Sequence, residues 1–319
     1  NEKNILSFSG LSNSKIIHCN ENGYFSVYHS DRNGFNNPDY VWDKSIDIAT
    51  VGDSFVHGSC VNQGNDLASQ VRKITKLNTV NLGWHSTGPL RQYSSFIEYM
   101  DEIPKFVFWF YFENDLEELE YEMNNEILLK YYDNQNFKQY LKDTTIRKKI
   151  NDLLLIKHNE FINEKLQLEP KVKIYHNLIN FLKLYNSRQL IIYNINKVIK
   201  ATSDDELIKN EEFLKIYLKL LGRMKSITDE NNSKLIIVYL PRQKYGFSRK
   251  AKMLDKIKSE IFEFAENKKI DTIDIEKLID INYINPTILY PQLHRGMHFN
   301  EKGYKFVAEQ IAEYIDKNK

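Results

Sequence analysis

The stretch Ile46-Asp47-Ile48-Ala49-Thr50-Val51-Gly52-Asp53-Ser54-Phe55 decides the fold, because it joins a buried-strand pattern to a turn. Its apolar, β-branched first half predicts a short strand that is buried on both faces. Gly52, Asp53 and Ser54 then predict a turn that leaves the Ser54 hydroxyl at the carboxyl end of this strand. Ligands of open α/β sheets bind at that edge, so Ser54 is the first candidate functional residue.

Four later runs share this pattern and complete a predicted sheet. Helical patterns separate most of the runs: one after an Asn65-Asp66 cap, one over Glu211–Glu230, and a last one that starts after Asn300. Strands that alternate with helices predict a parallel, doubly wound sheet of the α/β class. The five predicted strands are Ile46–Gly52, Thr79–Gly83, Lys105–Phe112, Lys234–Leu240 and Ile270–Ile275.

Two segments fall outside this repeat. Residues 1–45 contain Tyr24-Phe25-Ser26-Val27-Tyr28, an alternating strand pattern, followed by a segment dense in turn residues. We expect them to form an N-terminal arm or hairpin packed on the core domain, residues 46–319. Residues from about 116 to 205 are charged and Leu-rich, which predicts a helical insertion too long for a single crossover. The insertion forms either a cap beside the carboxyl edge of the sheet or an oligomerisation surface.

The composition is that of a soluble globular protein, with 42% hydrophobic and 27% charged residues among 319. The net charge of +1 gives no general attraction to nucleic acid or to an anionic membrane. Two cysteines, Cys19 and Cys60, are too few for a disulfide framework, but they allow one disulfide bridge. No apolar stretch reaches the roughly 20 residues of a membrane span. Because the chain starts at Asn1, a removed signal or anchor stays open, and a cell-envelope or periplasmic location is favoured over the cytoplasm.

Three further loops carry polar residues to the edge where Ser54 lies. The second strand ends in Asn81-Leu82-Gly83-Trp84-His85-Ser86-Thr87-Gly88-Pro89, the third in Tyr111-Phe112-Glu113-Asn114-Asp115, and His298 precedes the last helix. All four loops converge on one edge of a doubly wound sheet. A serine nucleophile needs a base, and His298 is the candidate. Neither His-Glu-x-x-His spacing nor a Gly-rich phosphate loop occurs, so no metal and no cofactor are predicted.

The order of these four blocks resembles the SGNH, or GDSL-type, hydrolase superfamily. The resemblance covers about residues 46–115 and 233–316. The segment Asp31-Arg32-Asn33-Gly34-Phe35-Asn36-Asn37-Pro38 also looks like one that precedes the Gly-Asp-Ser block in some bacterial, often membrane-anchored, members. The resemblance implies a flavodoxin-like three-layer sandwich built on a five-stranded parallel sheet.

The resemblance also implies residue roles. Ser54 would be the acyl-accepting nucleophile, and His298 its general base and then the acid that protonates the leaving alcohol. The oxyanion hole would take the backbone N–H of Ser54, the side-chain amide of Asn114 and a backbone N–H of the second block. In that block the family's donor glycine falls at Ser86, and Gly83 is the alternative.

The last block departs from the family pattern. The family usually has an aspartate three residues before the histidine, and this chain has Arg295 there. Arginine cannot accept a hydrogen bond, so another group must orient His298. We expect a Ser-His dyad in which a backbone carbonyl near Arg295 holds the imidazole; a distant carboxylate, Asp274 or Asp280, is the alternative. Arg295 itself would contact an anionic substrate or form a surface ion pair.

Other residues of the same loops receive supporting roles. Asp53 and Asp115 are expected to brace their turns, and Trp84 and His85 are candidate substrate contacts. Phe112 stands where the family usually has glycine. The change from glycine to Ser86 in the second block would narrow the approach and reshape the acyl pocket.

These features favour a serine esterase that removes an O-acetyl or short acyl group from a carbohydrate or glycolipid. An O-acyltransferase on the same scaffold is a close alternative, because access of water decides between them. An alternative of another class is a catalytically degenerate scaffold that binds a glycan or a partner protein, for which Arg295 is the main support. The expected partner is therefore a small-molecule or glycan ester, not nucleic acid, with membrane association only through a removed anchor.

Overall fold

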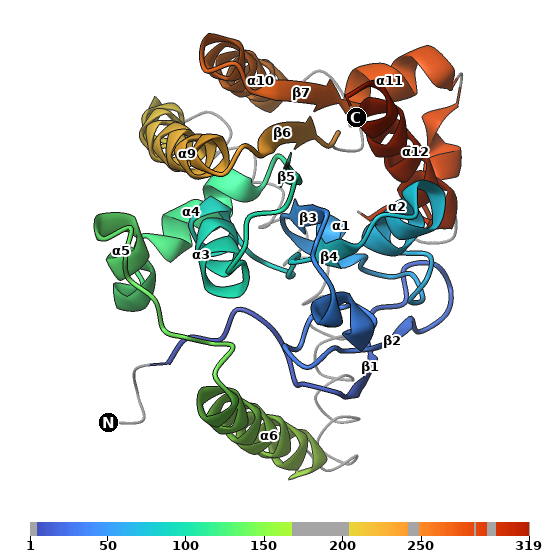
Figure 1. Cartoon of the computed structure of the whole chain (residues 1–319), viewed down its shortest axis with the longest axis vertical. Helices are drawn as coiled ribbons and strands as arrows, with labels where there is room; N and C mark the ends of the chain where they lie inside the picture. The colour runs from blue at the N-terminus through green and yellow to red at the C-terminus, as the bar shows by residue number, and fades with distance from the viewer. Residues whose placement is uncertain (1–4, 168–203, 242–248, 284, 292–297, 319) are drawn as a thin grey trace, which may run out of the picture.

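The computed structural model describes residues 5–167, 204–241, 249–283, 285–291 and 298–318. Its core is a five-stranded parallel sheet with the strand order β4-β3-β5-β6-β7 (Figure 1). Each strand lies within one of the five predicted runs, so the predicted α/β class and sheet are confirmed. The strands are β3 (Ile48–Val51), β4 (Thr79–Asn81), β5 (Phe106–Tyr111), β6 (Lys234–Tyr239) and β7 (Asp271–Asp274).

Helices cover both faces of the sheet and complete three layers (Figure 1). Along β5, Val107 and Trp109 face one helical layer, while Phe108 and Phe110 face the other. This two-sided burial is why the strands read as continuous apolar runs rather than as alternating ones. One layer contains α3 (Pro89–Tyr99), α9 (Asp204–Glu230) and α10 (Arg249–Asn267); the other contains α2 (Leu67–Thr75), α11 (Ile275–Asn282) and α12 (Glu301–Lys317).

β3 lies at the point where the order of strand addition reverses. It pairs with β4 on one side and with β5 on the other: Ile48 lies opposite both Thr79 and Phe106. In doubly wound sheets the crevice outside the carboxyl ends of the strands at such a switch point is where ligands bind. Ser54 follows β3 directly and therefore lies at this crevice.

The N-terminal arm contains a small hairpin beside the sheet domain. Strand β1 (Lys15–Ile17) pairs antiparallel with β2 (Val27–His29). The predicted strand over residues 24–28 begins later than expected, because the backbone N–H of Ser26 bonds the carbonyl of Cys19 at 2.9 Å and Gly23 bonds Asn20 at 3.0 Å. Residues 19–26 are thus the turn of the hairpin, and we call them the hairpin tip.

The turn-rich segment after the hairpin fastens the arm to the sheet. The buried Asp31 carboxylate accepts hydrogen bonds from the backbone N–H groups of Asn33 and Phe35 and from the side chains of Asn37 and Trp42. The Asn37 side chain in turn donates to the carbonyl of Asn81, at the end of β4, and accepts its N–H. Four donors on one buried carboxylate require this loop to keep one conformation. It ends in the short 3₁₀ helix η2 (Asp39–Asp43).

The region predicted as a helical insertion begins with three helices, α4 (Asp115–Glu122), α5 (Glu126–Asp133) and α6 (Thr144–Gln167). Helix α4 lies against α3 and α9. Arg147 of α6 instead reaches the arm, where it donates to the hydroxyls of Ser12 and Ser9. Residues 168–203 lie outside the described residues, so the choice between a cap and an oligomerisation surface stays a prediction. None of the described helices has both the length and the apolarity that crossing a membrane requires.

Candidate active site

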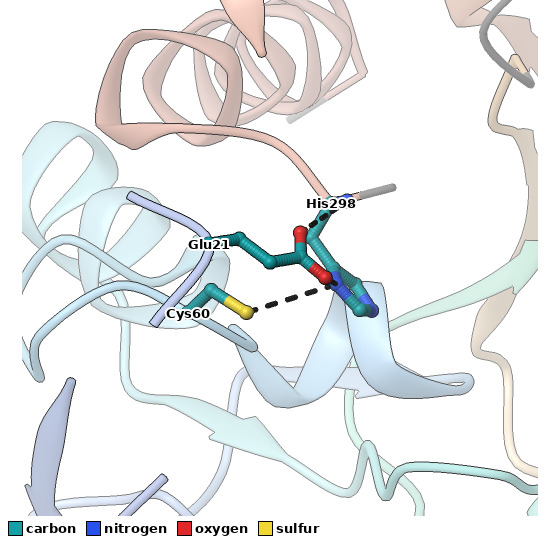
Figure 2. A group of neighbouring side chains, drawn as sticks. All are labelled: Glu21, Cys60 and His298. Carbon is teal, nitrogen blue, oxygen red and sulfur yellow. Dashed lines mark hydrogen bonds and ion pairs between the residues drawn. The ribbon is translucent and has the colours of Figure 1, made fainter. Parts of the chain in front are cut away.

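Ser54, His298 and Glu21 form a continuous hydrogen-bonded chain at the carboxyl edge of the sheet. The Nε2 atom of His298 lies 2.9 Å from the Ser54 Oγ, and its Nδ1 atom lies 3.0 Å from the Glu21 Oε1. The backbone N–H of His298 donates to the other Glu21 oxygen at 3.0 Å. Figure 2 shows the Glu21 carboxylate facing the imidazole. A hydroxyl, an imidazole and a carboxylate in this order have the geometry of a Ser-His-acid triad.

The turn after β3 aims the Ser54 side chain. Ser54 is the first residue of the short helix α1 (Ser54–His57), and the Asp53 carboxylate caps it by accepting the backbone N–H of Phe55 at 2.9 Å. Gly52 is required here, because a Cβ would lie 2.5 Å from a methyl carbon of Val56, where the helix folds back over the strand. Asp53 therefore braces the turn, as its position predicts.

The start of the last helix holds His298. Asn300 caps α12: its Oδ1 accepts two backbone N–H groups of the first turn, and its Nδ2 donates to two carbonyls of the segment around η3 (Pro286–Leu289). The imidazole also packs against the ring of Phe55, with the ring centroids 5.2 Å apart. Two residues of α1 thus contact His298, one through its hydroxyl and one through its ring.

The expectation of a Ser-His dyad is wrong, because a carboxylate occupies the orienting position. It comes from Glu21 in the hairpin tip, and neither alternative from the C-terminal half fills the role. Asp274 instead caps α11 and pairs with Lys258 at 2.9 Å. Arg295 lies outside the described residues.

A disulfide between Cys19 and Cys60 joins the hairpin tip to the segment that follows α1. Cys19 lies two residues before Glu21 and Cys60 lies six after Ser54. The sequence alone did not decide whether these two cysteines pair. Their pairing is the sequence signal that could have placed Glu21 near the nucleophile.

Two of the expected oxyanion donors keep a free backbone N–H in the described part of the chain. Ser54 and Ser86 donate to no described residue through this group, whereas the N–H of Gly83 is taken by the Asn81 side chain at 2.8 Å. The N–H of Gly83 is therefore already used within its own loop. Ser86 has φ 52°, in the left-handed region that glycine adopts most readily.

Asn114 occupies the N-cap position of α4 without capping it. Its side chain makes no cap hydrogen bond, and its buried Oδ1 has no partner among the described residues. A buried amide oxygen without a partner costs stability unless something else uses it, and it is the Nδ2 of the same amide that could donate to an oxyanion. Its position after β5, next to the turn after β3, agrees with a role in the site.

Two buried carboxyl groups support the loops of the site. Asp115 accepts the backbone N–H of Phe112 at 2.8 Å and the side-chain amide of Gln92 at 2.9 Å, which closes the loop that carries Asn114. Burial raises the pKa of Asp53 to about 6. Burial, followed by the charge of Asp53, raises the pKa of Asp115 well above its ordinary value. Both groups thus act through hydrogen bonds to the backbone rather than as exposed acids.

A cluster of aromatic and histidine side chains lies beside the hydrogen-bonded residues Ser54, His298 and Glu21. The ring of Trp84 packs on His85, with centroids 4.5 Å apart, and on His57 at 5.4 Å. His18 of the arm packs on both histidines, at 5.1 and 5.4 Å. Burial lowers the pKa of His85 to about 4 and that of His57 well below its ordinary value, so both are neutral near pH 7. The cluster is uncharged, and Trp84 and His85 are partly exposed.

Among the described residues, Glu21, Cys60 and His298 place one potential metal ligand each within 4.8 Å of one another (Figure 2). The Cys60 sulfur is bonded to Cys19, so it is not the thiolate that binds metals. His298 and Glu21 are already paired with each other. With the disulfide closed, this donor set does not fit a metal ion.

No protein-family model and no curated protein sequence matches the chain. Solved structures do match it. A member of the lipolytic protein G-D-S-L family from Veillonella parvula DSM 2008 is 12% identical, with 84% of this chain and 97% of that one covered at a TM-score of 0.44. The lipase/acylhydrolase from Enterococcus faecalis is 13% identical, with 86% and 97% covered at 0.43.

Proposed function

We propose that this chain is a serine esterase of the SGNH type that forms an acyl-Ser54 intermediate. The observation that carries the proposal is the hydrogen-bonded chain Ser54–His298–Glu21, with contacts of 2.9 and 3.0 Å. The side chains of His298 and Glu21 are 14% and 25% exposed, so the pair is partly open to solvent. A core histidine would need no such hydroxyl on one nitrogen and a carboxylate on the other.

In the first half of the reaction, the Ser54 oxygen attacks the ester carbonyl carbon while His298 Nε2 accepts the hydroxyl proton. The tetrahedral intermediate then collapses, the bond to the alcohol breaks, and Nε2 returns the proton to the leaving oxygen. In the second half, water repeats the attack on the acyl-serine, which releases the acid and restores Ser54. Glu21 stays ionised throughout. Its carboxylate accepts the hydrogen bond from Nδ1–H of His298, which fixes the imidazole tautomer and stabilises the imidazolium.

Charge develops on the carbonyl oxygen during both halves. The backbone N–H groups of Ser54 and Ser86 and the side chain of Asn114 are the donors we assign to that oxygen. Donors held in place before the reaction lower the barrier because they need no reorganisation when the charge appears. Ser54 and Ser86 offer backbone groups, so only Asn114 can be removed by substitution.

For the substrate, we propose an O-acetyl or short acyl ester of a carbohydrate or glycolipid. Ser86 and Phe112 stand where the family usually has glycine, and their side chains limit the space for the acyl group. The Phe112 ring is buried against Phe55, with the ring centroids 4.5 Å apart. On the alcohol side, the partly exposed Trp84 and His85 supply an aromatic face beside polar nitrogens. Such a surface suits a sugar ring, which has apolar faces and a polar rim.

The test combines a fluorophosphonate probe with hydrolysis of p-nitrophenyl acetate. We expect labelling and turnover in the unmodified chain, and a loss of turnover on the order of 10⁴–10⁶-fold in Ser54→Ala and His298→Ala. Ser226→Ala, an exposed serine on α9, is the matched control and should keep both signals. An absence of labelling and of Ser54-dependent turnover would refute the esterase proposal and favour the binding scaffold.

The substrate class is tested with acetylated sugars against long-chain p-nitrophenyl esters. We expect kcat/KM to fall as the acyl chain lengthens, because Ser86 and Phe112 fill the acyl side. A preference for long chains would contradict this part of the proposal. Addition of a sugar acceptor to the same assay separates hydrolysis, which yields free acetate, from acyl transfer, which yields a new ester.

A further inference from the structure

The acid of the triad and the nucleophile belong to parts of the chain that one covalent bond joins. Glu21 lies in the hairpin tip, residues 19–26, and this tip lies outside the sheet layers that position the other catalytic groups. Cys19 of the tip is bonded to Cys60, in the segment that leaves α1. Figure 2 shows Glu21 and Cys60 approaching His298 from neighbouring segments.

Few other contacts hold this tip against the sheet domain. Among the described residues, and apart from the two hydrogen bonds that the Glu21 carboxylate accepts from His298 at 3.0 Å, Asn22 donates to the carbonyl of Cys60 at 2.8 Å, and Tyr24 donates to Glu301 at 3.0 Å through an exposed contact. Exposed hydrogen bonds contribute little, because water competes for both partners. Phe25 of the tip is 63% exposed and buries little area there. The disulfide is therefore the strongest single tether near Glu21.

Further along the arm, contacts are independent of the disulfide. The backbone N–H of Val27 bonds the Asn62 side chain at 2.9 Å, and that of Gln63 bonds the carbonyl of Val27 at 3.1 Å. The Asp31 loop is fixed by four donors on its buried carboxylate. Opening of the disulfide should thus loosen the tip while the rest of the arm stays attached.

We propose that the Cys19–Cys60 disulfide is a positioning device for Glu21, so that the activity depends on the redox state of this one bond. The inference rests on the proposed esterase function. With the bond closed, the Glu21 carboxylate is fixed on His298 at 3.0 Å. With the bond open, the tip samples other positions and His298 loses its orienting acid for much of the time, while Ser54 and the oxyanion donors keep their places.

The chemistry of opening is a two-electron reduction. A phosphine attacks one sulfur and breaks the S–S bond; water then supplies the oxygen of the phosphine oxide and the two protons of the thiols. The phosphine is oxidised and the disulfide is reduced to Cys19–SH and Cys60–SH. A dithiol does the same by exchange and ends as a disulfide itself.

The experiment compares oxidised and phosphine-reduced protein, with thiols counted to verify the state and EDTA present. EDTA is needed because reduced Cys60, beside Glu21 and His298, would resemble the ligand sets that bind zinc. We expect reduction to lower kcat at least about ten-fold with little change in KM, because an orienting interaction acts in the transition state. Reoxidation should restore kcat, and Cys19→Ser with Cys60→Ser should match the reduced protein.

Glu21→Gln distinguishes positioning from general stabilisation. If the disulfide acts through Glu21, reduction should leave the residual kcat of Glu21→Gln within about two-fold, because no acid remains to be displaced. An equal loss in both proteins, or a reduced chain that keeps its kcat, would overturn the inference. Absence of Ser54-dependent turnover in the oxidised protein would refute the esterase proposal instead, so the two failures are distinguishable.

Discussion

The two halves of the candidate site are built in different ways. The sheet edge supplies Ser54, Asn114 and His298 from turns that follow buried strands or precede a capped helix. The hairpin tip supplies Glu21 from a turn held by one disulfide and few hydrogen bonds. The nucleophile and base thus inherit their positions from the hydrophobic core, whereas the orienting acid depends on local tethers. Changes on the tip side, on the sheet side and at the boundary between them should therefore have different effects.

The largest effect is expected on the tip side, from Glu21→Gln. The amide keeps the size of the side chain but presents a donor, which favours the wrong imidazole tautomer, and such a change costs on the order of 10⁴ in kcat. Steady-state kinetics with p-nitrophenyl acetate measure it. Glu313→Gln, on the exposed face of α12, is the control and should retain full activity; a loss below about ten-fold in Glu21→Gln would return the site to a dyad.

The same contrast explains what could be predicted from the sequence. Ser54 and Asn114 follow apolar runs, and His298 precedes the cap Asn300, so strand and helix patterns located all three. Glu21 is 277 positions from His298 and lies in a turn with no periodic pattern. Periodicity reports which face of an element is buried, not which distant turn docks on it.

Two other features needed coordinates for related reasons. Gly83 and Ser86 are three residues apart in one loop, and the sequence does not show that the Gly83 N–H bonds the Asn81 side chain. The Cys19–Cys60 disulfide could not be predicted from the sequence, because two cysteines carry no spacing pattern of their own.

On the sheet side, Asn114→Ala should lower kcat on the order of 10²–10³-fold, which is the usual cost of one oxyanion donor. The fold should survive, because the Asn114 side chain makes no capping bond to α4. Asn124→Ala is a matched control, since the side chain of this exposed asparagine donates to the Glu120 carbonyl one turn away and lies outside the site. An unchanged kcat in Asn114→Ala would remove the residue from the oxyanion hole and leave only backbone donors there.

The boundary between the arm and the sheet edge should be sensitive to acid. Burial, then the charges of His18 and Arg91, lower the pKa of His85 from 6.5 to about 4. The unfolded chain therefore binds this proton first, and stability falls as pH drops from about 6.5 toward 4. One such group contributes about 2 kcal/mol to the loss between pH 7.5 and 5.

Urea unfolding at both pH values measures this loss in the free energy of unfolding. His85→Asn should lose less stability on acidification than the unmodified chain, by roughly that 2 kcal/mol. The buried His57, whose pKa burial also lowers, remains in both proteins and leaves part of the acid sensitivity in place. His158→Asn, on the exposed face of α6, should behave as the unmodified chain does; an equal acid loss in His85→Asn would assign the sensitivity elsewhere.

The smallest effect is expected at Ser86, whose φ of 52° is unfavourable for a residue with a Cβ. Ser86→Gly should raise the free energy of unfolding by about 0.5–1 kcal/mol, because relief of this conformation outweighs the extra freedom of glycine in the unfolded chain. Lys269→Gly, at φ 55° in the turn before β7, is a control far from the site and should gain a similar amount, because lysine does not share the tolerance of asparagine for this conformation. The Ser86 side chain is exposed in the structure. A loss of stability in Ser86→Gly alone would mean that this side chain makes contacts that offset the strain, so that side chains as well as the backbone stabilise the loop at the sheet edge.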